Sequence, residues 1–241
     1  MIRAIRGAIV VWLFVVFGLG ALFIRYLILP FAKNKMKKYE ILQKSWQFFI
    51  WIMKATRIIE VHSSNMERVK SIKNSIIVST HPSFIDIVIL MSLIPHSTCF
   101  VAQKLTRNPF FKGMVELLFI PDGEDTNKWL LDSQEKINEG LNIIIFPMGT
   151  RHDNHEQPKI RRGTAQIAHI TKKNIAVLHI ETSDRFLQSK QAIYDAGDKP
   201  IEFKIEYLGE INTSEYIEKY EDEVAFKTEM TKQIRKCLYK M

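Results

Sequence analysis

Short apolar runs that alternate with helix-like segments constrain the fold of this chain more than any other feature. The runs cover residues 76–78, 99–101, 117–120, 143–146, 175–180 and 201–208. The segments between them with helix-like patterns are 84–93, 109–116, 126–139 and 161–172, with a mostly polar helical tail at 214–240. Parallel strands need a crossover connection, which is usually a helix. The sequence therefore predicts an α/β fold with a mixed, largely parallel sheet flanked by helices, in which Thr126 caps one helix.

The first 60 residues differ from the rest in charge. They hold ten of the 34 Lys and Arg residues and two of the 26 Asp and Glu residues, so residues 61–241 have a net charge of zero. A basic arm that is also apolar is typical of proteins that bind anionic membranes, whereas nucleic-acid proteins carry a basic face on the folded domain. We therefore expect a membrane-anchoring arm at 1–60, a globular α/β domain at 61–241 and no nucleic-acid partner.

The arm contains two apolar stretches. Residues 8–24 carry no charge and are at the short end of what spans a bilayer core of about 30 Å. The lysines at 33–38 favour a cytoplasmic location for the domain that follows them. The length of the apolar run argues against a cleaved signal peptide. Residues 41–59 resemble an interfacial amphipathic helix, and the alternative is a helix that packs on the domain core. The expected location is the cytoplasmic face of a membrane.

The cysteines and the His-rich loop predict neither a disulfide nor a metal site. Cys99 and Cys237 have no CxxC spacing and are expected to be reduced thiols in the cytosol. His152, Asp153 and His155 lie in a polar loop without a third ligand at a recognisable spacing. No metal or cofactor is predicted.

A first motif, His81-Pro-Ser-Phe-Ile-Asp86, directly follows a predicted strand. Sites in such sheets lie where strands end and helices begin. A carboxylate held against one imidazole nitrogen fixes the tautomer, and the other nitrogen can take a proton from a hydroxyl. The alternative is that His81 caps a helix whose first turn holds Asp86. Because no G-x-S-x-G is present, the motif predicts direct attack by a hydroxyl on a thioester without an acyl-enzyme.

A second motif, Phe146-Pro-Met-Gly-Thr-Arg151, also follows a predicted strand. Gly149, Thr150 and Arg151 offer backbone N–H groups, a hydroxyl and a guanidinium to a phosphate, although an ordinary turn with an exposed arginine has the same pattern. Lys104 follows another predicted strand and is expected at the same edge. Arg161 and Arg162, just before Gly163, are expected to be solvated, and the alternative is that they add charge near a helix start.

These blocks resemble the 1-acylglycerol-3-phosphate acyltransferases (lysophosphatidate acyltransferases). The similarity is carried by the following segments: His81 with Asp86, 101–104, 108–113, 119–120, 146–151 and 161–165. The resemblance implies that His81 is a general base with Asp86 as its partner. It implies that the Gly149–Arg151 loop helps to bind the acceptor phosphate. It also implies acyl-CoA or acyl-carrier protein as donor and attachment to the cytoplasmic leaflet.

The chain departs from that family at three points. Met148 replaces a usual Glu, no Arg follows Ile120, and no Pro interrupts the strand at 175–180. The acidic stretch at 122–125 also weakens the expectation of a phosphate acceptor. Three functions therefore stay open: acylation of lysophosphatidate, acylation of another lipid such as an aminolipid, glycolipid or secondary-metabolite lipid, and non-catalytic lipid binding.

Overall fold

The computed structural model describes residues 1–102, 115, 118–123, 125–154 and 156–240. Its helices are α1 (Ile2–Phe23), α2 (Lys35–Ala55), α3 (Met66–Lys70), α4 (Asp86–Leu93), α6 (Thr126–Asn138), α7 (Gly163–Thr171), α8 (Thr213–Lys219) and α9 (Glu223–Leu238). Its strands are β1 (Ile59–Ser63), β2 (Ile76–Ser79), β3 (Ser97–Ala102), β4 (Ile120–Asp122), β5 (Asn142–Ile145), β6 (Ile175–Thr182) and β7 (Ile201–Ile211). A π-helical turn (Ile24–Ile28) and a 3₁₀ turn (Leu29–Phe31) extend α1.

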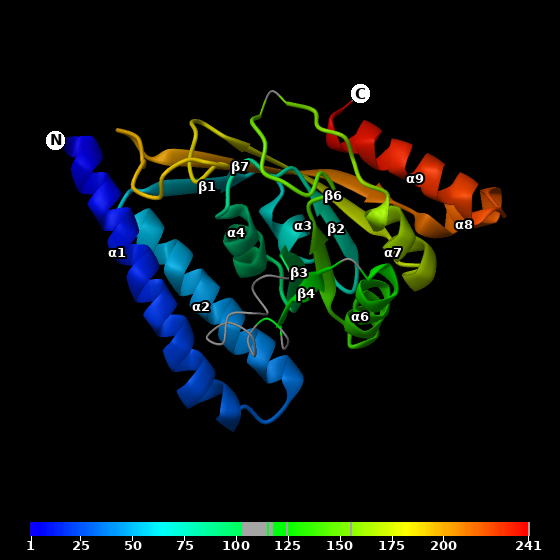
Figure 1. The fold of residues 1–241 in the computed structure, drawn as a ribbon, viewed down its shortest axis with the longest axis horizontal. Helices are drawn as coiled ribbons and strands as arrows, with labels where there is room; N and C mark the ends of the chain where they lie inside the picture. Colours follow the sequence, from blue (N-terminus) through cyan, green and yellow to red (C-terminus); the bar gives the residue numbers. More distant parts are fainter. Residues whose placement is uncertain (103–114, 116–117, 124, 155, 241) are drawn as a thin grey trace.

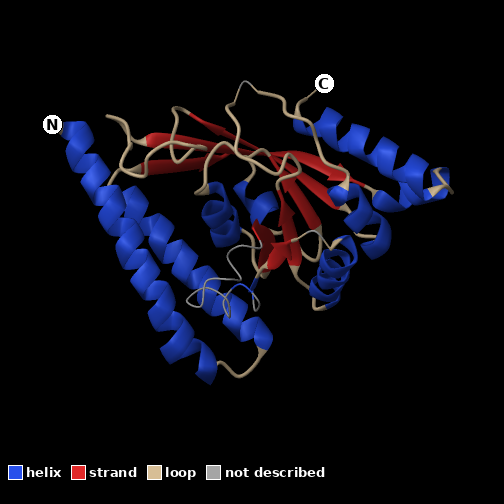
Figure 2. Cartoon of the chain, viewed as in Figure 1, coloured by secondary structure: helices blue, strands red, loops and turns tan. Residues whose placement is uncertain are grey.

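The strands form one mixed sheet in the order β1-β7-β6-β2-β5-β3-β4. The five strands from β6 to β4 are parallel to one another, whereas β7 is antiparallel to β6 and parallel to β1. Figure 2 shows the sheet in red with helices on both sides. The predicted fold class, a mixed and largely parallel sheet flanked by helices, is confirmed. The carboxyl ends of the parallel strands meet at one edge, which is where ligands bind in such sheets.

Alternate residues of each central strand face opposite layers of helices. Ile77 and Ile144 belong to a core cluster with α1, α2 and α4, and their neighbours Ile76 and Ile143 belong to a second cluster with α7 and α9. Figure 1 shows the two layers on opposite sides of the sheet. Both faces are buried, so these strands are continuous Ile and Val runs instead of alternating apolar and polar residues.

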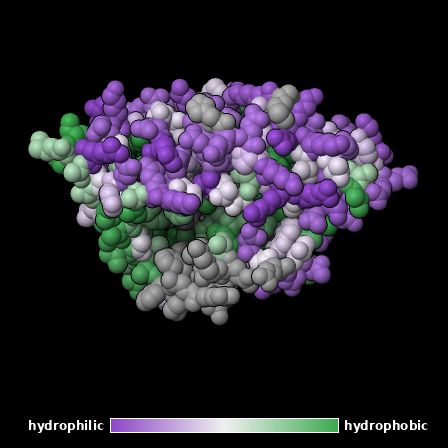
Figure 3. Space-filling model, turned by 45° about the horizontal axis from the view of Figure 1, so that its top comes forward, coloured by the Kyte–Doolittle hydropathy of each residue, from purple (hydrophilic) through white to green (hydrophobic). Residues whose placement is uncertain are grey.

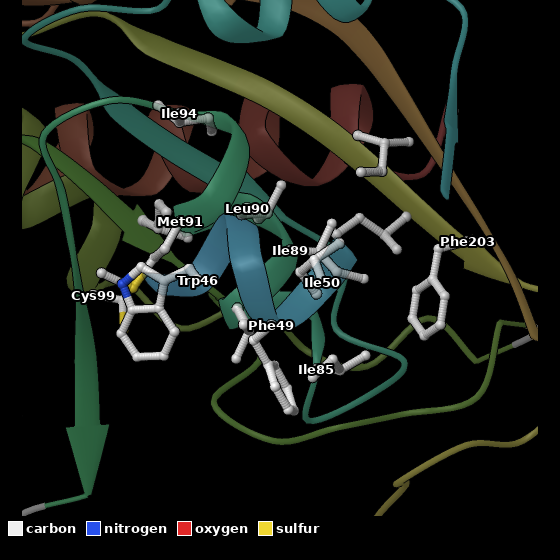
Figure 4. Close-up of a cluster of buried hydrophobic side chains, with 14 of the residues drawn as sticks. Trp46, Phe49, Ile50, Ile85, Ile89, Leu90, Met91, Ile94, Cys99 and Phe203 are labelled. Carbon is white, nitrogen blue, oxygen red and sulfur yellow. The ribbon is translucent and has the colours of Figure 1, made fainter. Parts of the chain in front are cut away.

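The first cluster is built largely from α2 and α4. Figure 4 shows Trp46, Phe49 and Ile50 of α2 beside Ile85, Ile89 and Leu90, which lie in α4 or directly before it. The two helices give the sheet one continuous apolar cover, because their facing side chains are almost fully buried. This cover also fixes Asp86, the first residue of α4, near the sheet edge.

Several predicted boundaries are wrong. The helix predicted to reach residue 59 ends at Ala55, and Ile59 begins β1, a strand that the sequence patterns did not reveal. The strand expected at 117–120 begins only at Ile120, and the helix predicted at 161–172 begins at Gly163. The tail predicted to be helical contains the helices α8 and α9. The helix predicted at 109–116 lies almost wholly outside the described residues.

The cap of α6 is one residue earlier than predicted. Asp125, not Thr126, accepts hydrogen bonds from the backbone N–H groups of Asn127 and Lys128. A carboxylate is a strong N-cap and also favours the positive end of the helix dipole.

The N-terminal arm is a hairpin of α1 and α2 that packs on the domain (Figure 1). Phe17 of α1 lies 4.2 Å from Phe49 of α2 between ring centroids, and Met53 of α2 is fully buried. The opposite face of α2 exposes Phe48 and Trp51, at 61% and 62%. One face thus packs on the core, as the alternative prediction had it, and the other remains free for a membrane interface. The division into residues 1–60 and 61–241 stays a prediction.

One helical segment of the described chain, Ile2–Phe31, is long and apolar enough to cross a membrane. The most apolar stretch of 18 residues in this segment has a mean hydropathy of 2.6, and 17% of that stretch is buried inside the structure. Large apolar side chains, among them Trp12, Val15, Leu19 and Phe23, are exposed along it. Figure 3 shows this apolar surface at the left of the molecule, while most of the visible face is polar.

Candidate active site

The predicted base and its partner lie together at the carboxyl edge of the sheet. His81 follows β2 by two residues, and Asp86 is the first residue of α4. The Nδ1 atom of His81 lies 3.0 Å from Oδ2 of Asp86. This hydrogen bond leaves Nε2 as the imidazole nitrogen that is available to a substrate. The short connection from strand to helix is what brings the two side chains together.

Asp86 is fully buried and receives its hydrogen bonds on one oxygen. Oδ2 accepts from the Ser83 backbone N–H at 2.7 Å as well as from His81, while Oδ1 has no partner among the described residues. Burial raises the pKa of Asp86, and the hydrogen bonds from His81 and the Ser83 N–H lower it. The two bonds favour the carboxylate that an orienting partner of His81 requires.

The imidazole plane of His81 is fixed by a second ring. Phe146, directly after β5, stacks on it with 4.0 Å between centroids and 19° between planes. Strands β2 and β5 are parallel neighbours, so their carboxyl ends deliver the two rings to the same place. The first and second sequence motifs therefore meet at His81.

His152 supports the backbone of His81 and was not foreseen in this role. Its ring atom Nε2 accepts a hydrogen bond from the backbone N–H of His81. The backbone N–H of His152 in turn donates to the His81 carbonyl. Its Nδ1 lies 2.9 Å from the Asp153 carbonyl, so Nδ1 carries the proton and both ring nitrogens are engaged. Burial lowers the pKa of His152 and favours this neutral form. The sequence offered only its proximity to the second motif as a signal.

The predicted phosphate loop is differently arranged from expectation. Gly149 has a φ of 73°, but its N–H donates to the Phe146 carbonyl. Thr150 is exposed, and Nη1 of Arg151 donates to the carbonyls of Leu187 and Gln188. Burial lowers the pKa of Arg151. A phosphate-binding role for this loop remains a prediction, and the predicted Lys104 lies outside the described residues.

A cleft of about 490 Å³ opens beside His81. Its floor and walls are mainly apolar and include Ile87, Phe100, Trp129 and Phe146. The polar side chains in the lining are those of His81, Asp122, Arg161, Arg162, Thr164 and Gln166. The two arginines are exposed, as expected, and they also line the cleft. This placement fits the alternative prediction that they add charge near a helix start.

Met148 is buried and belongs to the second core cluster. It packs with Ile160 and the helices on that side of the sheet instead of facing the cleft. A carboxylate at this position would be buried among apolar side chains, so an apolar residue suits this packing.

The chain matches a known protein family and resembles a solved structure. Residues 58–180 match the family described as Acyltransferase. The crystal structure of the 1-acyl-sn-glycerophosphate (LPA) acyltransferase PlsC from Thermotoga maritima is similar over 99% of this chain and 98% of that chain. The TM-score is 0.70 and the sequence identity 15%, so this likeness concerns the fold. Among curated proteins, none matches significantly.

The family match covers more than half of the 241 residues and includes His81, Asp86 and the second motif. The matched segment begins just before β1 and ends in β6. It therefore includes the central strands of the sheet and the residues that line the cleft. The chain belongs to the Acyltransferase family.

Proposed function

We propose that this protein transfers a fatty acyl group from an acyl thioester to the free hydroxyl of 1-acylglycerol-3-phosphate, which gives phosphatidate. The observation that carries the proposal is the hydrogen-bonded pair of His81 and Asp86 at the wall of an apolar cleft. Membership of the Acyltransferase family and the PlsC-like fold support it.

The reaction follows from the hydrogen bonds of His81. Its Nε2 accepts the proton of the acceptor hydroxyl while the hydroxyl oxygen attacks the thioester carbonyl. Asp86 stabilises the imidazolium that forms. Collapse of the tetrahedral intermediate breaks the carbon–sulfur bond, and the leaving thiolate takes the proton back from His81. The new ester bond and the free thiol balance the reaction without an acyl-enzyme.

The donor is an acyl-CoA or an acyl-carrier protein, which acts as co-substrate, and no cofactor takes part. The apolar walls around Ile87, Phe100 and Trp129 suit the acyl chain. Burial of that chain beside His81 favours binding by the hydrophobic effect and keeps water from the thioester.

The α1–α2 hairpin serves as a membrane anchor that lies in one leaflet. The guanidinium of Arg6 in α1 donates to the carbonyls of Arg57 and Ile58, directly after α2. Both ends of the hairpin are therefore held at the domain, which fits an embedded hairpin better than a single span. The exposed apolar side chains of α1, together with Trp51, form the embedded surface. The lysines of the hairpin favour the cytoplasmic leaflet.

A second candidate is the same reaction on another lipid hydroxyl. Asp122 lines the cleft, and a carboxylate there opposes a phosphorylated acceptor. An aminolipid would pair with it, and a glycolipid would hydrogen-bond to it.

The first experiment measures thiol release from acyl-CoA and from acyl-carrier protein by membranes that contain the protein. The assay compares the wild type with His81→Ala and with the control His62→Ala, whose side chain is exposed on β1. The proposal expects release that needs both lysophosphatidate and His81. Release by folded wild type that needs another lipid hydroxyl would favour the second candidate. No release with any acceptor or donor would refute both.

A further inference from the structure

The first turn of α7 forms part of the cleft wall. Gly163 and Thr164 line the cleft, and no side chain in the described part of the chain caps this helix. Within the described residues, nothing accepts a hydrogen bond from the N–H groups of Gly163, Thr164 and Ala165. Free N–H groups at a helix start carry partial positive charge and bind anions.

A buried hydroxyl without a partner lies in the same turn. Thr164 is 2% exposed, and its Oγ1 has no hydrogen-bond partner among the described residues. Leaving a buried polar atom unpaired is costly, so such an atom in a native protein calls for an explanation, and a bound ligand is one. Because Thr164 lines the cleft, a ligand in the cleft can supply the missing partner.

Two cations flank this helix start. Arg161 and Arg162 line the cleft directly before α7, and neither has an acidic partner within the described part of the chain. The Arg161 N–H donates to the Pro147 carbonyl, which ties the segment to the second motif. A methyl group on Gly149 would lie 2.5 Å from Cζ of Arg161, so the glycine makes room for the guanidinium.

We infer that the start of α7 binds a phosphate group of a substrate through Arg161, Arg162, the free N–H groups and the Thr164 hydroxyl. The inference rests on the proposed function for the identity of that substrate. It differs from the predicted site at Gly149–Arg151, where the Gly149 N–H and the Arg151 guanidinium already bind backbone carbonyls. Asp122 also lines the cleft, but its one negative charge is outnumbered by the two guanidinium groups and the partial positive charge of the helix start.

The proposed reaction has two phosphorylated substrates, lysophosphatidate and acyl-CoA, so the test must separate them. The variants are Thr164→Val, which removes the hydroxyl, and Arg162→Gln, which removes a charge. Lys159→Gln is the matched control, because it removes a nearby charge that does not line the cleft. The KM for lysophosphatidate and for acyl-CoA is measured for each, with monoacylglycerol as the acceptor without phosphate and acyl-pantetheine as the donor without its nucleotide.

Loss of a charge-assisted hydrogen bond predicts that both site variants raise one KM by about tenfold or more, with kcat little changed. A rise for lysophosphatidate with unchanged monoacylglycerol kinetics assigns the site to the acceptor. A rise for acyl-CoA with unchanged acyl-pantetheine kinetics assigns it to the donor. Unchanged KM values for both phosphorylated substrates, or equal changes in Lys159→Gln, would overturn the inference.

A binding measurement separates this site from the proposed function. Inorganic phosphate should raise the melting temperature of the full-length wild type in a concentration-dependent way, and Arg162→Gln should abolish the shift. A shift that persists in Arg162→Gln, or no shift in the wild type, would count against the site whatever the enzyme acylates. A phosphate shift without lysophosphatidate turnover would leave the site standing and remove the proposed acceptor.

Discussion

Replacement of Asp86 by Asn tests how the carboxylate acts on His81. Both hydrogen bonds to the carboxylate, from Ser83 N–H and His81 Nδ1, end on the same oxygen, Oδ2. An Asn oxygen at that position can keep both bonds. An amide nitrogen there would face the Ser83 N–H, donor against donor, and lose that bond. The structure therefore predicts that the imidazole keeps its tautomer in Asp86→Asn.

The predicted loss comes from the missing charge alone. An imidazolium and a carboxylate whose charge centres are about 4 Å apart attract each other by about 4 kcal/mol at an effective dielectric constant of 20. Without this attraction the transition state loses about 10³-fold in rate. The Asn amide nitrogen would occupy the site of Oδ1, which has no described partner, at a cost of about 1–3 kcal/mol in stability. The removal of a buried charge offsets part of that cost.

The assay is kcat for thiol release at saturating acceptor and donor, with the melting temperature as the measure of folding. Asp86→Asn is compared with His81→Ala and with Asp198→Asn, an exposed carboxylate in a loop. We expect a folded protein whose kcat is about 10³-fold reduced but still above that of His81→Ala. A kcat within tenfold of the wild type would refute the charge argument. A loss equal to that of His81→Ala would refute the preserved tautomer.

Three further predictions concern stability and reactivity. Arg6→Met removes hydrogen bonds to five backbone carbonyls. We expect the free energy of unfolding to fall by about 2–4 kcal/mol and the melting temperature by about 5–10 °C. An unchanged melting curve would contradict this. Burial lowers the pKa of His152, so the unfolded state binds more protons and stability is lost as the pH falls below about 6.5. His152→Gln should flatten that dependence by at most about 1.4 kcal/mol per pH unit, and an unaltered slope in equilibrium unfolding would exclude the assignment. Burial raises the pKa of Cys99 to about 12. We therefore expect iodoacetamide to modify only the half-exposed Cys237 in the native protein, as measured by mass spectrometry of peptides. Labelling of Cys99 in the native protein would disprove its burial.

The local features of the site were accessible from the sequence because they depend on short-range connections. A run of Ile and Val residues that is buried on both faces identifies β2 and β5 directly. His81 and Asp86 are five residues apart across one strand-to-helix turn, so their contact needs no long-range information. The basic, apolar N-terminal arm was likewise visible from composition alone.

The strand order and the polar wall of the cleft depended on tertiary structure. The strand β1 alternates apolar and polar residues over a short length, and it exists because β7 pairs with it across the chain. The direction of Arg151 toward residues 187–188, and of Arg161 and Arg162 toward the cleft, depends on how distant loops pack.

The sequence by itself determined the fold class, the His–Asp pair and the basic arm, because periodicity, composition and short-range contacts are encoded locally. Only the tertiary structure decided which arginines line the cleft, that His152 supports the backbone of His81, and that Thr164 lacks a hydrogen-bond partner among the described residues. Those outcomes depend on packing between segments far apart in the chain, and no local pattern encodes that packing.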